Sequence, residues 1–282
     1  MLLVDAGWDR AAGLEGLERS LGTFGAAVAD VRGVLFTHAH RDHYALGDLL
    51  RDASGAWLAL HEAERSTLTR DVDVLERYFA DLGLPLDELG DAVESALWMW
   101  GSRPAFEPDR RLRDGEVVAG LRVLHTPGHA PGHACFVAEE RGVVFSGDHV
   151  LSRTTPNVSV FAGSAGSPLD DYLRALAATR SLAGLLALPG HEERCDLAAR
   201  STELLAHHDR QLRHAAKLVA DGRDTVRAAA EAMEWTTPWA ALGTLDRQLA
   251  LGETYAHLLV LEHSGVLERI SEKPLRWGAA RR

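Results

Sequence analysis

The chain has 282 residues, a formal net charge of −11, 46% hydrophobic residues and 25% charged residues. This length suits one large domain or a large and a small one, and the composition is that of an ordinary globular protein. With no run of about 18 uncharged apolar residues and a charge already at Asp5, we expect neither a membrane span nor a signal peptide. Cys135 and Cys195 alone do not make a disulfide framework, so we expect a cytoplasmic protein.

The acidic excess lies entirely in the first 200 residues, because residues 201–282 hold 11 Lys/Arg and 11 Asp/Glu. Nucleic-acid binding depends largely on cationic contacts to phosphate, so this distribution argues against a polyanionic substrate. The basic residues are nearly all arginine, and alanine, leucine and glycine are abundant. This codon-usage signature indicates a bacterial genome rich in GC and carries no information on function.

The first 61 residues alternate between short apolar runs and helical patterns, which predicts an α/β protein. The expected strands and helices are a strand from Leu2 into the Asp5-Ala6-Gly7 turn, a helix over 13–21, a strand over 31–36, a helix beginning over 44–50, and a strand over 56–61.

From about residue 62 to residue 108, apolar residues recur at the spacing i, i+3, i+4 and i+7, which predicts a helical insertion. The insertion carries Trp98 and Trp100 near its end. It either forms a lid that brings these two side chains over a substrate or packs on the protein core, and the pattern leaves both open.

Strand patterns resume after the insertion and give way to helices near residue 198. Expected strands lie at 116–118, 121–124, 135–138, 143–145 and 185–188, with a helix over 169–182 and a hairpin turn over 139–142. Beyond the boundary we expect helices over 201–219, 225–233 and 241–263, followed by an extended tail over 265–270. Gly252 leaves open whether the last helix is continuous.

Polar clusters follow several of these strands directly. The stretch 37–43 reads Thr-His-Ala-His-Arg-Asp-His, and Thr-Pro-Gly-His, Gly-Asp and Pro-Gly-His follow at 126–129, 147–148 and 189–191. Functional groups of α/β sheets gather at the carboxyl ends of strands, and borderline ions such as zinc take histidine and aspartate together. A merely histidine-rich surface loop would not explain the ordered ligands that follow.

Together and in this order, the four motifs resemble the metallo-β-lactamase superfamily over roughly residues 1–195, and glyoxalase-II-like hydrolases most of all. The resemblance implies an αββα sandwich as a catalytic domain over 1–198, with the insertion at 62–108. Members usually carry a strand or two before the Asp-x-Gly turn, and here only Leu2–Val4 precede it. Either the sheet lacks its first edge strands or the true start lies upstream. Residues 199–282 resemble the small winged-helix-like tail of another branch, and we expect them to pack or to form a homodimer.

Carried over to this sequence, the family pattern implies two divalent metal ions, zinc in the first place, with iron or manganese as alternatives. His38, His40 and His129 would hold the first ion, Asp42, His43 and His191 the second, and Asp148 would bridge them. His133, only four residues past His129, would support the site without binding metal. Asp5 would either orient a ligand in the same way or cap the first helix.

Two adjacent ions would hold a bridging hydroxide that attacks an acyl carbon, with Asp42 and Asp148 as the catalytic carboxylates. A thiolate leaves without an obligatory proton donor, whereas an amide nitrogen needs one, and Asp42 is the only candidate. We therefore expect a small-molecule acyl substrate, a thioester or an ester or lactone. The alternatives are a phosphodiesterase or nuclease of the same superfamily, and a nucleic-acid-binding protein acting through the C-terminal domain. Against the last, residues 241–263 offer only Arg247 among several carboxylates.

Overall fold

The computed structural model describes residues 1–8, 11–64, 71–100, 107–164 and 166–280, which form two compact units. Unit 1 comprises Met1–Arg65, Arg103–Pro156 and Arg174–Thr202, and unit 2 comprises Ser66–Ser102, Asn157–Leu173 and Glu203–Arg282. Each unit draws on several stretches of the chain, and the predicted division into domains at residue 198 stays a prediction.

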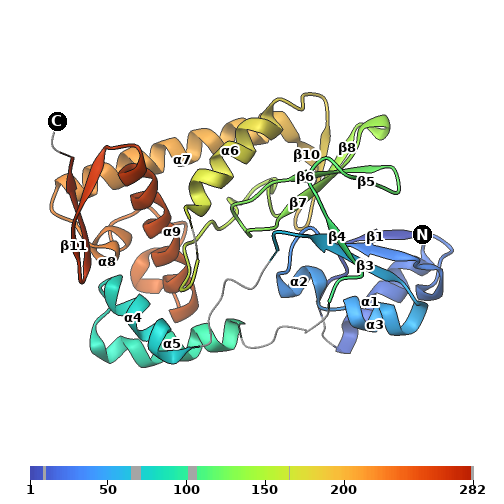
Figure 1. Ribbon diagram of the computed structural model, residues 1–282, viewed down its shortest axis with the longest axis horizontal. Coiled ribbons are helices and arrows are strands. Elements are labelled where there is room, and N and C mark those ends of the chain that lie inside the picture. The colour runs from blue at the N-terminus through green and yellow to red at the C-terminus, as the bar shows by residue number, and fades with distance from the viewer. Residues whose placement is uncertain (9–10, 65–70, 101–106, 165, 281–282) are drawn as a thin grey trace. The chain divides into compact units, whose positions relative to one another are not determined.

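Unit 1 contains a parallel sheet of four strands in the order β1-β2-β3-β4 (Figure 1). These strands are β1 (Leu2–Val4), β2 (Gly33–Leu35), β3 (Trp57–His61) and β4 (Arg110–Leu112). The fourth strand was not predicted, because its first two residues are exposed arginines and only Leu112 is buried. An edge strand of this kind lacks the apolar pattern by which strands are recognised.

A second sheet of six strands has the order β10-β9-β8-β7-β6-β5, in which only β8 and β9 are parallel. The strands are β5 (Val117–Val118), β6 (Leu121–His125), β7 (Ala134–Ala138), β8 (Val143–Gly147), β9 (Leu186–Pro189) and β10 (Cys195–Asp196). The predicted hairpin joins β7 to β8 through a 3-10 turn, η2 (Glu139–Arg141).

The two sheets pack face to face, and helices cover the outer faces. On β2, Leu35 points inward to a core that includes Phe136 of the other sheet, while Val34, and Phe36 directly after the strand, point outward. The outward side chains meet α1 (Ala11–Gly22) and α3 (Gly47–Ser54), with η1 (Val28–Asp30) beside them (Figure 1). Val137 and Val144 are buried on the outer face of the second sheet, toward the unit-1 residues of α6 (Pro168–Arg180) and α7 (Leu197–Ala220). Unit 1 is therefore the expected αββα sandwich.

Unit 2 is mainly helical and brings the insertion and the C-terminal helices into one core. Its elements are α4 (Val72–Asp81), α5 (Leu86–Trp100), the remainder of α7, α8 (Val226–Ala230), η3 (Trp239–Ala241), α9 (Thr244–His263), β11 (Leu267–Glu272) and β12 (Leu275–Ala279). Gln248 on α9 donates a hydrogen bond to the carbonyl of Ala92 on α5, at 2.6 Å. The insertion is helical as predicted. Trp98 and Trp100 lie on α5, but their side chains lie outside the described residues, so the lid stays a prediction.

The last helix, α9, runs unbroken through Gly252, and the glycine permits a close approach instead. Val160 donates its backbone N–H to the carbonyl of Gly252 at 3.0 Å. A Cβ at position 252 would lie 2.8 Å from the Cβ of Ser159, which is too close for two carbon atoms. After α9, the expected extended tail is an antiparallel hairpin, β11–β12. The C-terminal region is helical as expected, and its winged-helix character stays a prediction.

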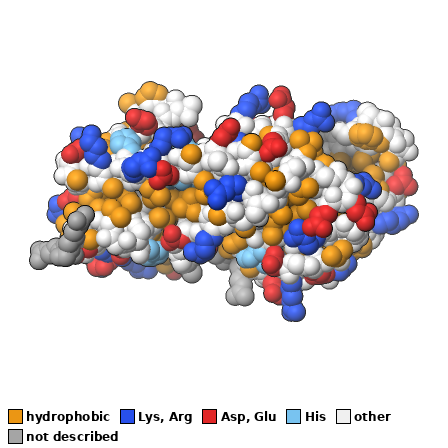
Figure 2. All heavy atoms as spheres, turned by 90° about the horizontal axis from the view of Figure 1, so that it is seen from above, with side chains coloured by type: hydrophobic (Ala, Val, Ile, Leu, Met, Phe, Trp, Pro, Cys, Tyr) orange, Lys and Arg blue, Asp and Glu red, His pale blue; other side chains and the backbone are white. Residues whose placement is uncertain are grey.

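The surface carries charges of both signs. Acidic and basic side chains are interspersed over the face of the molecule shown in Figure 2. Within the part of the chain that the structure describes, no helix is both long enough and apolar enough to cross a membrane.

Candidate metal centre

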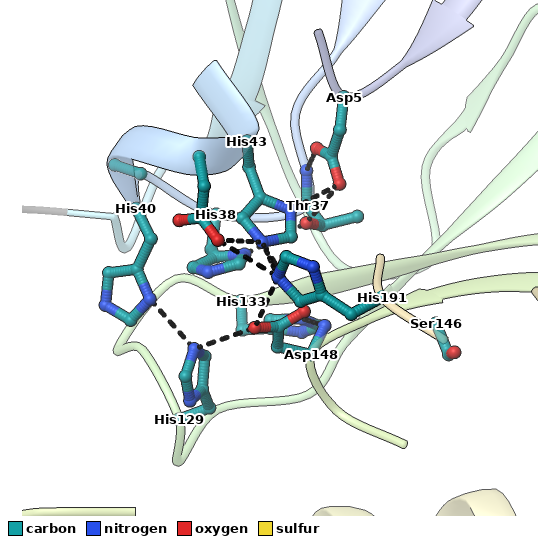
Figure 3. A network of polar contacts seen from close by, with 12 residues as sticks. Asp5, Thr37, His38, His40, His43, His129, His133, Ser146, Asp148 and His191 are labelled. Atoms are coloured by element: carbon teal, nitrogen blue, oxygen red, sulfur yellow. Dashed lines mark hydrogen bonds and ion pairs between the residues drawn. The ribbon is translucent and has the colours of Figure 1, made fainter. Parts of the chain in front are cut away.

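All seven predicted ligands lie together in unit 1, and Figure 3 shows the five histidines and Asp148 among them. They come from four segments: the loop after β2 with the short helix α2 (Arg41–Tyr44), the turn between β6 and β7, the residue after β8 and the residues after β9. Parallel and antiparallel strands of both sheets thus deliver side chains to a common rim, as their positions at strand ends predicted.

One group of three histidines can share a single ion. The ligand nitrogens of His38, His40 and His129 all lie within 4.8 Å of one another. Nε2 of His129 is 2.8 Å from Nδ1 of His40, and the rings of His38 and His40 meet edge to face. Three imidazoles at this spacing match the three-histidine sites that hold zinc.

A second group consists of Asp42, His43 and His191, whose ligand atoms also lie within 4.8 Å of one another. Nε2 of His43 is 3.2 Å from Nε2 of His191, and Oδ2 of Asp42 is 3.0 Å from the same His191 atom. A carboxylate and two imidazoles are a donor set suited to a divalent ion of borderline softness.

The carboxylate of Asp148 lies between the two groups (Figure 3). Its Oδ2 is 3.6 Å from Nε2 of His129 and 3.6 Å from Nε2 of His191, and its Oδ1 is 3.4 Å from Nε2 of His43. Asp148 therefore contacts His129 of the first group and both histidines of the second group. Burial opposes its charge, but hydrogen bonding to His43 and the surrounding histidines lower the pKa of Asp148 far below its usual value.

Hydrogen bonding leaves one nitrogen of His38 unpaired. The carboxylate of Asp5 accepts the hydroxyl proton of Thr37 at 2.9 Å, so the Thr37 oxygen must accept the Nδ1 proton of His38 at 3.0 Å. Nε2 of His38 therefore carries a lone pair, and it is buried without a hydrogen-bond partner among the described residues. A buried acceptor left unpaired is costly, and Nε2 of His38 fits a bound cation.

Asp5 also fixes the orientation of His43. Its Oδ2 lies 2.9 Å from Nδ1 of His43, which directs Nε2 toward Asp148 and His191. Burial would lower the pKa of His43, but hydrogen bonds to Asp148 and Asp5 raise it to about 10. Asp5 adopts φ +57, a left-handed conformation that costs a non-glycine residue energy. Its observed contacts are those of the orienting role considered from the sequence.

His133 is buried with both ring nitrogens engaged. Nε2 accepts the backbone N–H of Asp148 at 3.1 Å, so Nδ1 carries the proton and donates it to the Thr126 hydroxyl at 2.8 Å. Burial, together with nearby histidines, holds the pKa of His133 well below its usual value, which keeps the ring neutral. Gly147 approaches this ring so closely that a Cβ would lie 2.7 Å from Nε2. His133 thus supports the Asp148 backbone and has no nitrogen left for metal.

Two glutamates of the site were missed by sequence reasoning. Glu192, at φ +69, accepts hydrogen bonds from the backbone N–H of Arg153, the hydroxyl of Ser152 and both donors of Thr154. Desolvation opposes the effect of these bonds, which lower the pKa of Glu192 to about 2. Glu64 bonds to two of the ligand-bearing loops. Glu192 could have been suspected as a site residue because it directly follows His191 in the sequence. The sequence around Glu64 contains no motif that would place Glu64 in the site.

Comparison with known proteins gives a consistent picture. Residues 2–191 match the family model described as the metallo-beta-lactamase superfamily. A crystal structure of a metallo-beta-lactamase family protein from Thermus thermophilus is 34% identical and superposes with a TM-score of 0.80, covering 98% of this chain and 89% of that one.

Among curated proteins, a probable metallo-hydrolase of Bacillus subtilis, YqjP, is 28% identical over 205 residues, which is 68% of this chain and 64% of that protein. An atrochrysone carboxyl ACP thioesterase of Aspergillus fumigatus is 32% identical over 93 residues, 30% of this chain and 27% of that protein. The chain thus spans less than two-thirds of the length of these curated relatives.

Proposed function

Because this chain belongs to the metallo-beta-lactamase superfamily, we propose that it is a hydrolase that holds two divalent ions, zinc foremost, and cleaves thioester or ester bonds of small acyl substrates. The observation that carries the proposal is the position of Asp148. One carboxylate contacts histidines of both three-residue groups, and each group by itself has the donors for one ion.

In this proposal, His38, His40 and His129 hold one ion, Asp42, His43 and His191 hold the other, and Asp148 serves both. Bound there, two divalent ions lower the pKa of water and act as Lewis acids toward an acyl carbonyl. The protein supplies the fixed geometry: the Asp5–Thr37–His38 chain sets the tautomer of His38, and the Asp5–His43 contact orients the His43 ring toward Asp148 and His191.

The choice of a thioester or ester follows from what the site lacks and what it offers. Cys135 is buried, which raises the pKa of its thiol to about 12, so it is no nucleophile. Of the two carboxylate ligands, Asp42 is more exposed than Asp148 and is the better candidate to donate a proton to a leaving group, although it also binds metal in this proposal. A thiolate needs little help to leave. The thioesterase named among the relatives adds support for the acyl class.

The test combines metal analysis with a substrate panel. Purified protein is expected to contain about two ions per chain, and to hydrolyse thioesters or lactones faster than phosphodiesters in a side-by-side assay. Asp148→Asn should lose both the ions and the activity. Asp48, in the same unit, is an exposed carboxylate that pairs with Arg51, so Asp48→Asn is the matched control. Faster turnover of phosphodiesters would reject the acyl assignment, and fewer than one ion per chain after reconstitution would reject the metal site.

A further inference from the structure

Glu64 joins two loops that carry metal ligands. It lies three residues past the end of β3 and its side chain is buried, with 8% of the residue exposed. Oε1 accepts the backbone N–H of Ala39 at 3.0 Å, and Oε2 accepts the backbone N–H of Gly132 at 2.6 Å. Ala39 stands between His38 and His40, and Gly132 stands three residues past His129.

These two hydrogen bonds are of the strong kind. A carboxylate that accepts backbone N–H groups makes short, charge-assisted bonds, and burial makes the loss of either bond costly. The loops they join come from β2 of one sheet and from the β6–β7 turn of the other. One side chain therefore joins the backbone that carries His40 to the backbone that carries His129, in addition to the direct backbone hydrogen bond from Ala134 to Thr37 at 2.8 Å.

The spacing of these loops matters because the histidines are crowded. Nδ1 of His40 and Nε2 of His129 are 2.8 Å apart, and on one ion both atoms must present lone pairs. In the metal-free protein one of the two nitrogens can donate a hydrogen bond to the other, but a shared ion removes that bond, so the loops must then be held by other groups. Glu64 holds them through the backbone, away from the ligand atoms themselves.

Gly132 shows how closely Glu64 meets the turn. A Cβ built at position 132 would lie 2.2 Å from the backbone nitrogen of Glu64 and 2.4 Å from its Cα. These are backbone atoms and cannot rotate away, so any larger residue at 132 must separate the turn from Glu64. The contact thus depends on a carboxylate of this length on one side and a glycine on the other.

We propose that Glu64 is a positioning residue that holds the His38–His40 loop and the His129 turn at the separation that lets these three histidines share one ion. The proposal rests on the proposed function only for the presence of metal at that group. It concerns the first ion specifically, since Glu64 hydrogen-bonds to the backbone between His38 and His40 and to the turn that carries His129.

The experiment measures zinc binding by chelator competition in the full chain, for the unchanged protein, Glu64→Gln and Glu62→Gln. In Glu64→Gln an amide NH₂ faces a backbone N–H, so one loop loses its acceptor. We expect one of two ions to bind about 10–100-fold more weakly while the other is retained. Glu62, two residues away, pairs with Arg113 at the surface, and Glu62→Gln should bind both ions normally.

Two further variants separate positioning from a general loss of folding. Glu64→Asp keeps the charge but is one methylene too short to reach both loops, and should weaken the same ion less. Gly132→Ala keeps Glu64 but displaces the turn, and should reproduce the defect of Glu64→Gln. Cobalt substitution provides a second readout, because the visible spectrum of cobalt at the first site should change in Glu64→Asp and in Gly132→Ala. Thermal unfolding of the metal-free variants checks that each of them is folded.

If folded Glu64→Gln binds both zinc ions as tightly as the unchanged protein, the proposal is overturned. Equal weakening of the binding of both ions would also overturn it. These outcomes are independent of the substrate: a protein that binds two ions but hydrolyses no thioester refutes the proposed function and leaves the zinc affinities to decide the role of Glu64. A protein that binds no ion at all overturns both.

Discussion

The Asp5 carboxylate is the most informative place to perturb the site without touching a ligand. It makes three contacts: with the backbone N–H of Thr37 at 2.8 Å, the hydroxyl of Thr37 at 2.9 Å and Nδ1 of His43 at 2.9 Å. Asp5→Asn preserves the shape of the side chain. Asparagine also tolerates the left-handed backbone at φ +57, so no strain is added.

The amide retains one oxygen and turns an NH₂ group toward partners that now lack an acceptor. If the oxygen stays on the Thr37 backbone, Nδ1 of His43 loses its acceptor, and the ring loses the contact that directs Nε2 toward Asp148 and His191. Loss of such an orienting partner typically weakens metal binding 10–100-fold, which is about 1.4–2.7 kcal/mol.

The assay is zinc affinity by chelator competition at neutral pH, with circular dichroism to confirm folding. Asp48 is an exposed carboxylate that pairs with Arg51 on α3. The control variant Asp48→Asn makes the same change in charge as Asp5→Asn and should leave the zinc affinity unchanged. An Asp5→Asn variant that binds both ions as tightly as the unchanged protein would show that Asp5 does not orient His43 for metal binding.

Three further predictions concern other residues. His129→Ala should remove one ion and abolish acyl hydrolysis, whereas His133→Ala should keep two ions and lower the free energy of unfolding by about 1–3 kcal/mol; the reverse pattern in metal content would refute our choice of ligand. Gly190→Ala should lose the second ion on metal analysis, because the added Cβ would lie 2.5 Å from Cε1 of His43, and normal metal content would contradict the packing described. Burial raises the pKa of Glu253 from 4.5 to about 7, so the cost of its charge to the fold is complete above pH 7, decreases as the pH falls from 7 toward 4.5, and is lost below 4.5. Glu253→Gln should therefore be more stable than the parent at about pH 8 by on the order of 1–3 kcal/mol and by much less at about pH 5, by chemical denaturation; equal stability at both pH values would contradict the raised pKa.

The ligands could be predicted from sequence because each stands directly after a strand and within a short motif. Because strand ends converge on one rim, His38, His129, Asp148 and His191 were expected to lie together, and their assignment to two ions followed from the resemblance to the family. Buried central strands are similarly legible, since β2 and β7 are apolar along their whole length.

Features that depend on tertiary contact could not be predicted in this way. The edge strand β4 begins with two arginines, and its pairing with β3 is determined by the sheet rather than by its own apolar pattern. Gly252 marks a potential helix break in sequence, but it lies in a continuous helix because Ser159 packs against it. Glu64 acts through backbone groups of loops distant in sequence, and no local motif records such contacts.

The central claim is that Asp148 joins two metal sites, and anomalous diffraction from crystals of the zinc-loaded protein tests it most directly. The account predicts two zinc peaks roughly 3.5–4 Å apart, one beside His38, His40 and His129, the other beside Asp42, His43 and His191, with the Asp148 carboxylate between them. A single peak, or two peaks of which one lies away from Asp148, would contradict it.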